Sequence, residues 1–149
     1  KLSFHSRHQA KLRSYIYIIL NRISPPSIKK NRVWHVKKKL DFKLMQKGAK
    51  KLLGNHDFST FRASNCYAKS PIKTLKKASI KKKNDKIIIQ FESKSFLRNQ
   101  VRSMVGCLKY LSTGKWSIGD FKKAFKSKKR ELCAPPAPAS GLYLLNVKY

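Results

Sequence analysis

Apolar residues alternate with polar ones, or form short continuous runs, in several segments that have the length of a β-strand. The segment from Leu12 to Asn21 is rich in Tyr and Ile, and a period of two places Tyr15 and Tyr17 on one face. Asn84-Asp85 is a turn signal between two further segments, so a hairpin is predicted there. The predicted strands are residues 12–21, 73–83, 86–93 and 142–149.

A helical period follows Asp41, a residue suited to cap a helix. Gly54 is placed to end this helix. Its apolar residues at helical spacing are Met45, Ala49, Leu52 and Leu53. Another helix is predicted to begin at Ser117, because Asp120 three residues later completes a capping box.

The clearest helical pattern runs from Phe96 to Leu111. Its apolar stripe consists of Leu97, Val101, Met104, Val105, Leu108 and Leu111. Arg98 and Arg102 are four residues apart, so the pattern places both on another face of the same helix. This helix is therefore predicted to pack against the core with one face and to present a basic edge with another.

The segments between these elements are predicted to be irregular. Residues 24–39 form a basic linker after two prolines, residues 55–71 show no clear period, and residues 134–138 form an extended Ala-Pro linker. Strands joined by hairpin-like connections and mixed with helices favour an α+β fold. We expect a single domain over residues 1–149, with a mainly antiparallel sheet and two to three helices packed on one face.

The charge is strongly unbalanced, with 36 Lys and Arg residues against six Asp and Glu and a formal net charge of +30. A compact domain of this charge is favoured when a polyanion neutralises it, and nucleic acid is the commonest polyanion in a cell. Most of the excess is lysine, which suits phosphate rather than base edges. A lysine-rich, solvated surface and a membrane surface remain alternatives. No apolar run approaches the roughly 20 residues of a membrane span.

The other residue types offer little catalytic or metal chemistry. Only Asp57 among the carboxylates lacks an obvious structural role, and an Asx turn is favoured over catalysis for it. The four histidines and three cysteines show no metal-binding spacing, so no metal site is predicted. The odd number of cysteines, without close spacing, indicates reduced, partly buried thiols in a reducing compartment.

Four segments read together carry a specific resemblance. They are Phe4-His5-Ser6-Arg7 with Arg13-Ser14-Tyr15-Ile16-Tyr17, then residues 53–62 (LGNHDFSTFR), residues 96–106 (FLRNQVRSMVG) and residues 137–144 (APASGLYL). Their order and spacing resemble the C-terminal half of the tRNA pseudouridine synthase A family, over nearly the whole chain. The resemblance implies a pseudouridine synthase-like half domain and, for the family, isomerisation of uridine in the tRNA anticodon arm without a cofactor.

The resemblance also implies roles for particular residues. Tyr15 matches a tyrosine that stacks on the target base, and Arg102 matches an arginine that pairs with the catalytic aspartate of an Arg-Thr-Asp motif. Their alternatives are a core strand tyrosine and a solvated or phosphate-binding arginine. The residues expected to contact RNA are Arg7, Arg13, Tyr15, Lys37, Lys38, Lys39, Arg62, Lys69, Arg98 and Arg102.

The sequence departs from the family in one respect, because no Arg-Thr-Asp occurs in these 149 residues. We therefore expect a non-catalytic RNA-binding protein derived from a synthase, with Tyr15 and Arg102 as vestiges of the site. The alternative is the C-terminal part of an active synthase, and a weaker one is a tRNA-binding domain that acts beside a separate catalytic chain.

The expected partners follow from the favoured interpretation. They are RNA, with ribosomal RNA favoured over tRNA, and other ribosomal proteins, while a homodimer is implied only by the resemblance. A mitochondrion or another organelle is the expected compartment, with the cytoplasm as the alternative. No membrane partner and no cofactor are expected.

Overall fold

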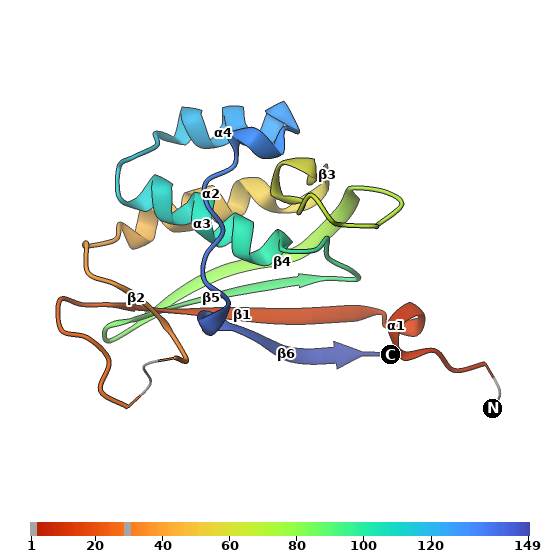
Figure 1. Cartoon of the computed structure of the whole chain (residues 1–149), viewed down its shortest axis with the longest axis horizontal. Coiled ribbons are helices and arrows are strands. Elements are labelled where there is room, and N and C mark those ends of the chain that lie inside the picture. Colours follow the sequence, from red (N-terminus) through yellow and green to blue (C-terminus); the bar gives the residue numbers. More distant parts are fainter. Residues whose placement is uncertain (1–2, 29–30) are drawn as a thin grey trace.

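The computed structural model describes residues 3–28 and 31–149, which fold into one six-stranded sheet and a set of helices above it (Figure 1). The strands are β1 (Leu12–Asn21), β2 (Trp34–Val36), β3 (Gly54–Asp57), β4 (Ile72–Lys83), β5 (Lys86–Ser93) and β6 (Leu142–Lys148). The α-helices are α1 (Ser6–Gln9), α2 (Phe42–Leu52), α3 (Gln100–Ser112) and α4 (Ile118–Ser127). Short 3-10 turns occupy Ser59–Phe61, Arg130–Leu132 and Ala139–Gly141.

The sheet has the order β2-β1-β5-β4-β3, and β6 pairs with the first half of β1. All pairings are antiparallel except that of β1 with β2. Helices α2 and α3 cover one face of the sheet, and α4 lies over them on the side away from the strands (Figure 1). The predicted α+β fold, with a mainly antiparallel sheet and helices on one face, is confirmed. None of the helices in the described ranges is long and apolar enough to span a membrane.

β5 follows the period of two that its sequence predicts, whereas β1 alternates less regularly because Ser14 and Leu20, on its other face, are also buried. In β5, Ile87, Ile89 and Phe91 are buried under the helices, while the residues between them are only half-buried. Tyr17 of β1 is fully buried, and Tyr15 on the same face is packed against the core without being covered completely. The hairpin turn at Asn84 is also confirmed, since this residue has the left-handed conformation (φ 54°) that asparagine tolerates.

The predicted caps of α2 and α4 are both present. The Asp41 side chain accepts a hydrogen bond from the Leu44 backbone N–H at 3.0 Å. In α4 the Ser117 hydroxyl accepts from the Asp120 N–H at 3.1 Å, and the Asp120 carboxylate accepts from the Ser117 N–H at 2.9 Å. These contacts satisfy backbone donors that the first turn of a helix leaves free. Leu53, predicted to lie on the apolar face of α2, instead follows its last residue and is 39% exposed.

Helix α3 begins four residues later than predicted. Asn99 has a left-handed backbone (φ 63°), so the segment from Phe96 to Asn99 cannot continue the helix. The buried Gln100 closes this turn, because its side-chain oxygen accepts a hydrogen bond from the Leu97 N–H at 2.8 Å. The apolar stripe is buried as predicted. However, Arg98 lies in the turn and not on the helix with Arg102, so that part of the prediction was wrong.

Two short strands were not predicted. β2 lies within the predicted basic linker, of which residues 29 and 30 are outside the described ranges. β3 begins at Gly54, the predicted helix stop, and continues into the predicted loop of residues 55–71. Strands of three or four residues carry too few positions to show a period. Their formation depends on pairing with the longer strands β1 and β4.

The extended Ala-Pro linker, confirmed as irregular, is closely packed on the fold. Residues 133–138, hereafter the strap, run from α4 across α3 to β6 (Figure 1). A Cβ atom at Gly106 of α3 would lie 2.1 Å from the Pro135 carbonyl oxygen, so only glycine allows this approach. The Tyr17 hydroxyl donates a hydrogen bond to the Pro138 carbonyl at 2.5 Å. The strap therefore packs on the core through Ala134 and Ala137, while its prolines are exposed.

Candidate functional site

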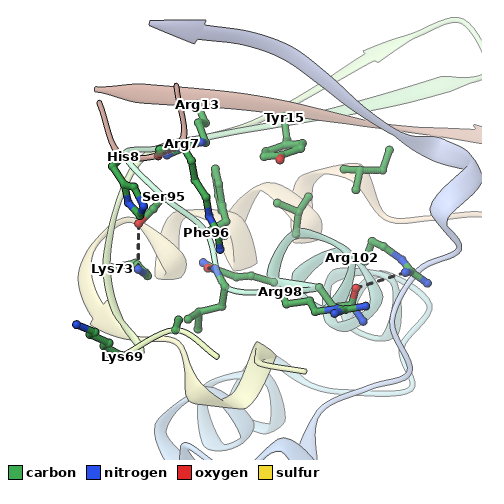
Figure 2. A pocket seen from close by; sticks show the side chains of 16 residues that line it. Arg7, His8, Arg13, Tyr15, Lys69, Lys73, Ser95, Phe96, Arg98 and Arg102 are labelled. Atoms are coloured by element: carbon green, nitrogen blue, oxygen red, sulfur yellow. Dashed lines mark hydrogen bonds between the residues drawn. The ribbon is translucent and has the colours of Figure 1, made fainter. Parts of the chain in front are cut away.

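A cleft of about 730 Å³ opens where β1, the turn before α3 and the N-terminal segment meet (Figure 2). It brings together residues far apart in the chain, and these include most of the cations expected to bind RNA. The expected residues that line it are Arg7, Arg13, Tyr15, Lys69, Arg98 and Arg102. His8, Lys73, Phe96 and Asn99 line it as well, although none of them was singled out as a site residue.

The inner wall of the cleft is apolar and aromatic. The Tyr15 and Phe96 rings meet edge to face, with their centroids 5.2 Å apart and their planes at 85°. Leu97, Val101 and Leu142 complete this wall. An aromatic surface of this kind offers a flat ring a place to stack, and nucleic-acid bases bind to such surfaces in many proteins.

The rim of the cleft is cationic, and no Asp or Glu lies among its lining residues. Within residues 3–28 and 31–149, the single ion pair joins Arg22 and Asp85 at 3.8 Å, on residues that do not line the cleft. The positive charge of the rim is therefore not neutralised by carboxylates in this part of the chain. A phosphate or a carboxylate brought into the cleft would meet complementary charge.

Arg102 is held in place by the strap. Its Nε donates to the Ala137 carbonyl at 2.7 Å, and the Ala137 N–H donates to the Arg102 carbonyl at 2.9 Å. The terminal nitrogen Nη1 makes a longer contact of 3.5 Å with the Asn99 side-chain oxygen (Figure 2). A guanidinium held in this way among the lining residues of the cleft suits two-point binding of an oxyanion.

Unlike Arg102, Arg13 uses its guanidinium to link two backbone segments. It donates to the Lys94 carbonyl and, at 2.5 Å, to the Arg7 carbonyl. These contacts tie the N-terminal segment to the end of β5. Opposite them, the Lys73 ammonium donates to the Ser95 hydroxyl at 2.9 Å (Figure 2).

Four of the residues expected to bind RNA lie away from the cleft. Lys37, Lys38 and Lys39 are exposed after β2 and do not line it. The Arg62 guanidinium donates to the carbonyls of Cys66, at 3.2 Å, and Ala68, at 2.5 Å, and so holds the loop that carries Lys69. Total charge predicted a polyanion partner but could not show which lysines share one surface.

A second hollow continues from the cleft on the far side of Asn99. This side groove consists of two adjoining depressions of about 410 and 430 Å³, and Asn99 lines both the cleft and the first depression. Its cations are Arg62, Lys128, Lys129 and Arg130, with Glu131 as its one acidic residue. The side groove therefore adds further basic residues beside the cleft.

The remaining acid–base and metal candidates are accounted for by structure. The Asp57 carboxylate accepts a hydrogen bond from the Ser59 N–H at 2.8 Å, which is the expected Asx turn. Burial alone would raise the pKa of Asp57, but the hydrogen bonds from Ser59 and the charges of Lys128 and Arg62 together hold this pKa below its usual value. Among the described residues, no three His, Cys, Asp or Glu side chains are grouped to bind a metal.

Comparison with known proteins identifies relatives along the whole chain. Residues 49–149 match the family model described as tRNA pseudouridine synthase. The tRNA pseudouridine synthase A of Pelagibacter ubique is 64% identical over 148 residues, which are 99% of this chain and 60% of that protein. The proteins of the same name from Caulobacter vibrioides and Bartonella tribocorum are 47% and 44% identical over 146 residues, with 98% of this chain covered. The chain thus spans about 60% of the length of these relatives.

Proposed function

The chain belongs to the tRNA pseudouridine synthase family, and we propose that it forms part of an active enzyme that converts uridine to pseudouridine in tRNA. The identity of 64% to a relative named as a synthase is the observation that carries the proposal. The expectation of a non-catalytic ribosomal protein finds no support in the comparisons. They favour the alternative, the C-terminal part of a synthase.

The cleft suits the part of the reaction that this chain would perform. Tyr15 would stack on the uracil ring, with Phe96 supporting its ring from the side. Arg102 would orient the carboxylate of the catalytic aspartate, which we propose comes from protein outside these 149 residues. The other rim cations would hold the phosphates on either side of the target nucleotide.

The direct test is pseudouridine formation by the protein that contains this chain together with the remaining length found in its relatives. Incubation with an unmodified tRNA transcript, followed by mapping of pseudouridine, should show modification. Tyr15→Ala should lower the rate by about 5- to 150-fold, because a stacking contact with a base contributes roughly 1–3 kcal/mol. Tyr149→Ala removes a tyrosine outside the cleft that is 53% exposed, and serves as the matched control.

Two results would contradict this proposal. One is that the longer protein binds tRNA but forms no pseudouridine in it. The other is modification by the 149-residue chain alone, which would show that no outside aspartate is required.

A second prediction concerns the path of the RNA. Log affinity for tRNA should fall linearly with log salt, with a slope of roughly 0.7 to 0.9 per phosphate neutralised. Replacement of Lys128, Lys129 and Arg130 by Ala should reduce that slope by about 2 to 3, because we propose that RNA phosphates occupy the side groove. The measurement is a binding titration at several salt concentrations.

The control for this experiment removes the same charge elsewhere. Lys81, Lys82 and Lys83 are three consecutive exposed cations at the end of β4, and none of them lines the cleft or the side groove. Their replacement by Ala should change the slope by less than one. Equal slopes for the two triple variants would show that the protein binds RNA through its total charge, without a preferred path.

A further inference from the structure

The two cysteines Cys107 and Cys133 lie against each other although 25 residues separate them in the sequence. Their Sγ atoms are 3.5 Å apart, and neither takes part in the proposed reaction. Cys107 is on α3 and is 1% exposed, while Cys133 is half-buried at the start of the strap. A disulfide needs its sulfur atoms at about 2.0 Å, so the two sulfur atoms must come about 1.5 Å closer for the bond to form.

We propose that Cys107 and Cys133 form a disulfide when the protein meets an oxidant, and that this bond fastens the strap to α3. The oxidant class that fits is a low-molecular-weight disulfide such as oxidised glutathione. Formation of this bond does not require the proposed synthase activity.

The surroundings assign the two sulfur atoms different tasks. The Cys107 thiol donates a hydrogen bond to Cys133, and this hydrogen bond lowers the pKa of Cys133. Burial alone would raise that pKa, but the Ser103 hydroxyl and the Arg130 charge lower it further, so the pKa of Cys133 lies below its usual value. The same contact, together with burial, raises the pKa of Cys107. Cys133 also lines the side groove, so a small oxidant can reach it from solvent. Cys133 is therefore the attacking thiolate and Cys107 the resolving thiol.

The exchange proceeds in two steps. The Cys133 thiolate attacks one sulfur of oxidised glutathione, forms a mixed disulfide and releases one glutathione thiolate. Cys107 then gives up its proton and attacks the Cys133 sulfur, so that the second glutathione leaves. Two protein thiols and one small disulfide thus become one protein disulfide and two glutathione thiols.

The bond would act on the proposed site through the strap. Ala137, four residues after Cys133, exchanges hydrogen bonds with the backbone and the guanidinium of Arg102. Fixing Cys133 to α3 restrains the chain between these two contacts. Oxidation is therefore expected to reduce local unfolding of the strap and to restrain the Arg102 side chain that hydrogen-bonds to it.

The test is oxidation of the protein by glutathione disulfide at about pH 8, near the usual pKa of a thiol. Free thiols are then alkylated, and the peptides are mapped by mass spectrometry. A linked peptide containing Cys107 and Cys133 is expected. The oxidised protein should melt roughly 5–15 °C higher than the reduced protein, and the Ala137 amide should exchange its hydrogen more slowly.

The variants separate this outcome from general oxidation. Cys107→Ser should leave Cys133 joined to glutathione and abolish the rise in melting temperature. Cys66→Ser should leave the linked peptide unchanged, since Cys66 contacts the Arg98 N–H and neither of the other two cysteines. The proposal is overturned if Cys107 and Cys133 remain alkylatable under conditions that oxidise Cys66. It is also overturned if Cys133 pairs with Cys66, or if the linked protein shows neither the melting shift nor the slower exchange.

Discussion

Val105→Asp should leave the protein largely unfolded at 25 °C. Val105 is fully buried in the middle of α3, within the core between the sheet and the helices. An aspartate there would bury a charge with no partner, which we expect to cost about 5 kcal/mol or more. That cost is comparable with the whole free energy of unfolding of an ordinary domain, about 5–15 kcal/mol. Far-ultraviolet circular dichroism and urea titration would measure the loss.

Two variants show whether the buried charge is the cause. Val105→Ala removes volume without adding charge and should cost only about 2 kcal/mol. Ile28→Asp introduces the same charge at a side chain that is 90% exposed, and should change the unfolding free energy by no more than about 0.5 kcal/mol. A native circular dichroism spectrum and an unchanged urea midpoint for Val105→Asp would show that the core of α3 is wrongly placed.

The second large effect is expected in catalysis by the longer protein. Arg102→Ala should lower kcat for pseudouridine formation by about 100-fold or more, because a misplaced catalytic group costs that much even when it is still present. Arg102→Lys should recover little of the rate, since a lysine cannot make the contact from Nε to Ala137 and also bind a carboxylate at two points. Single-turnover kinetics with saturating protein would separate kcat from binding.

Arg98→Ala provides the comparison at the same rim. Arg98 is exposed in the turn before α3, and its backbone rather than its side chain contacts Cys66. Its loss should weaken tRNA binding by less than about tenfold and leave kcat nearly unchanged. The proposed orienting role would be contradicted if the single-turnover rate of Arg102→Ala were within threefold of the rate of the protein without the substitution.

The elements that the sequence predicted well are those with many regularly spaced apolar residues. β1, β5 and the buried stripe of α3 each contain enough such positions for the period to appear. β2 and β3 do not, because they are too short and depend on their partner strands. The start of α3 was misplaced for another reason: the left-handed backbone at Asn99 is stabilised by surrounding structure, which periodicity does not detect.

The site was predictable only where motifs carried information. The resemblance placed Tyr15 and Arg102 together, and both line the cleft. Charge alone could not separate Arg98 from Lys37, since both are exposed cations and only the folded chain brings one of them to the cleft. The contact between Cys107 and Cys133 could not be predicted from the sequence either. Cys107 is in α3 and Cys133 is in the strap, and α4 lies between them in the chain.

The position of β6 has a consequence for the order in which this chain is made. Tyr17 of β1 pairs with Leu142 of β6, and the Tyr17 hydroxyl is bound by Pro138. Translation at about 5–20 residues per second therefore leaves the first strand waiting on the order of 10 s for its neighbour. Until β6 is made, the β1 backbone groups that pair with it lack their strand partner, and an open strand edge favours pairing with other chains. A chain interrupted within the strap would keep this edge open.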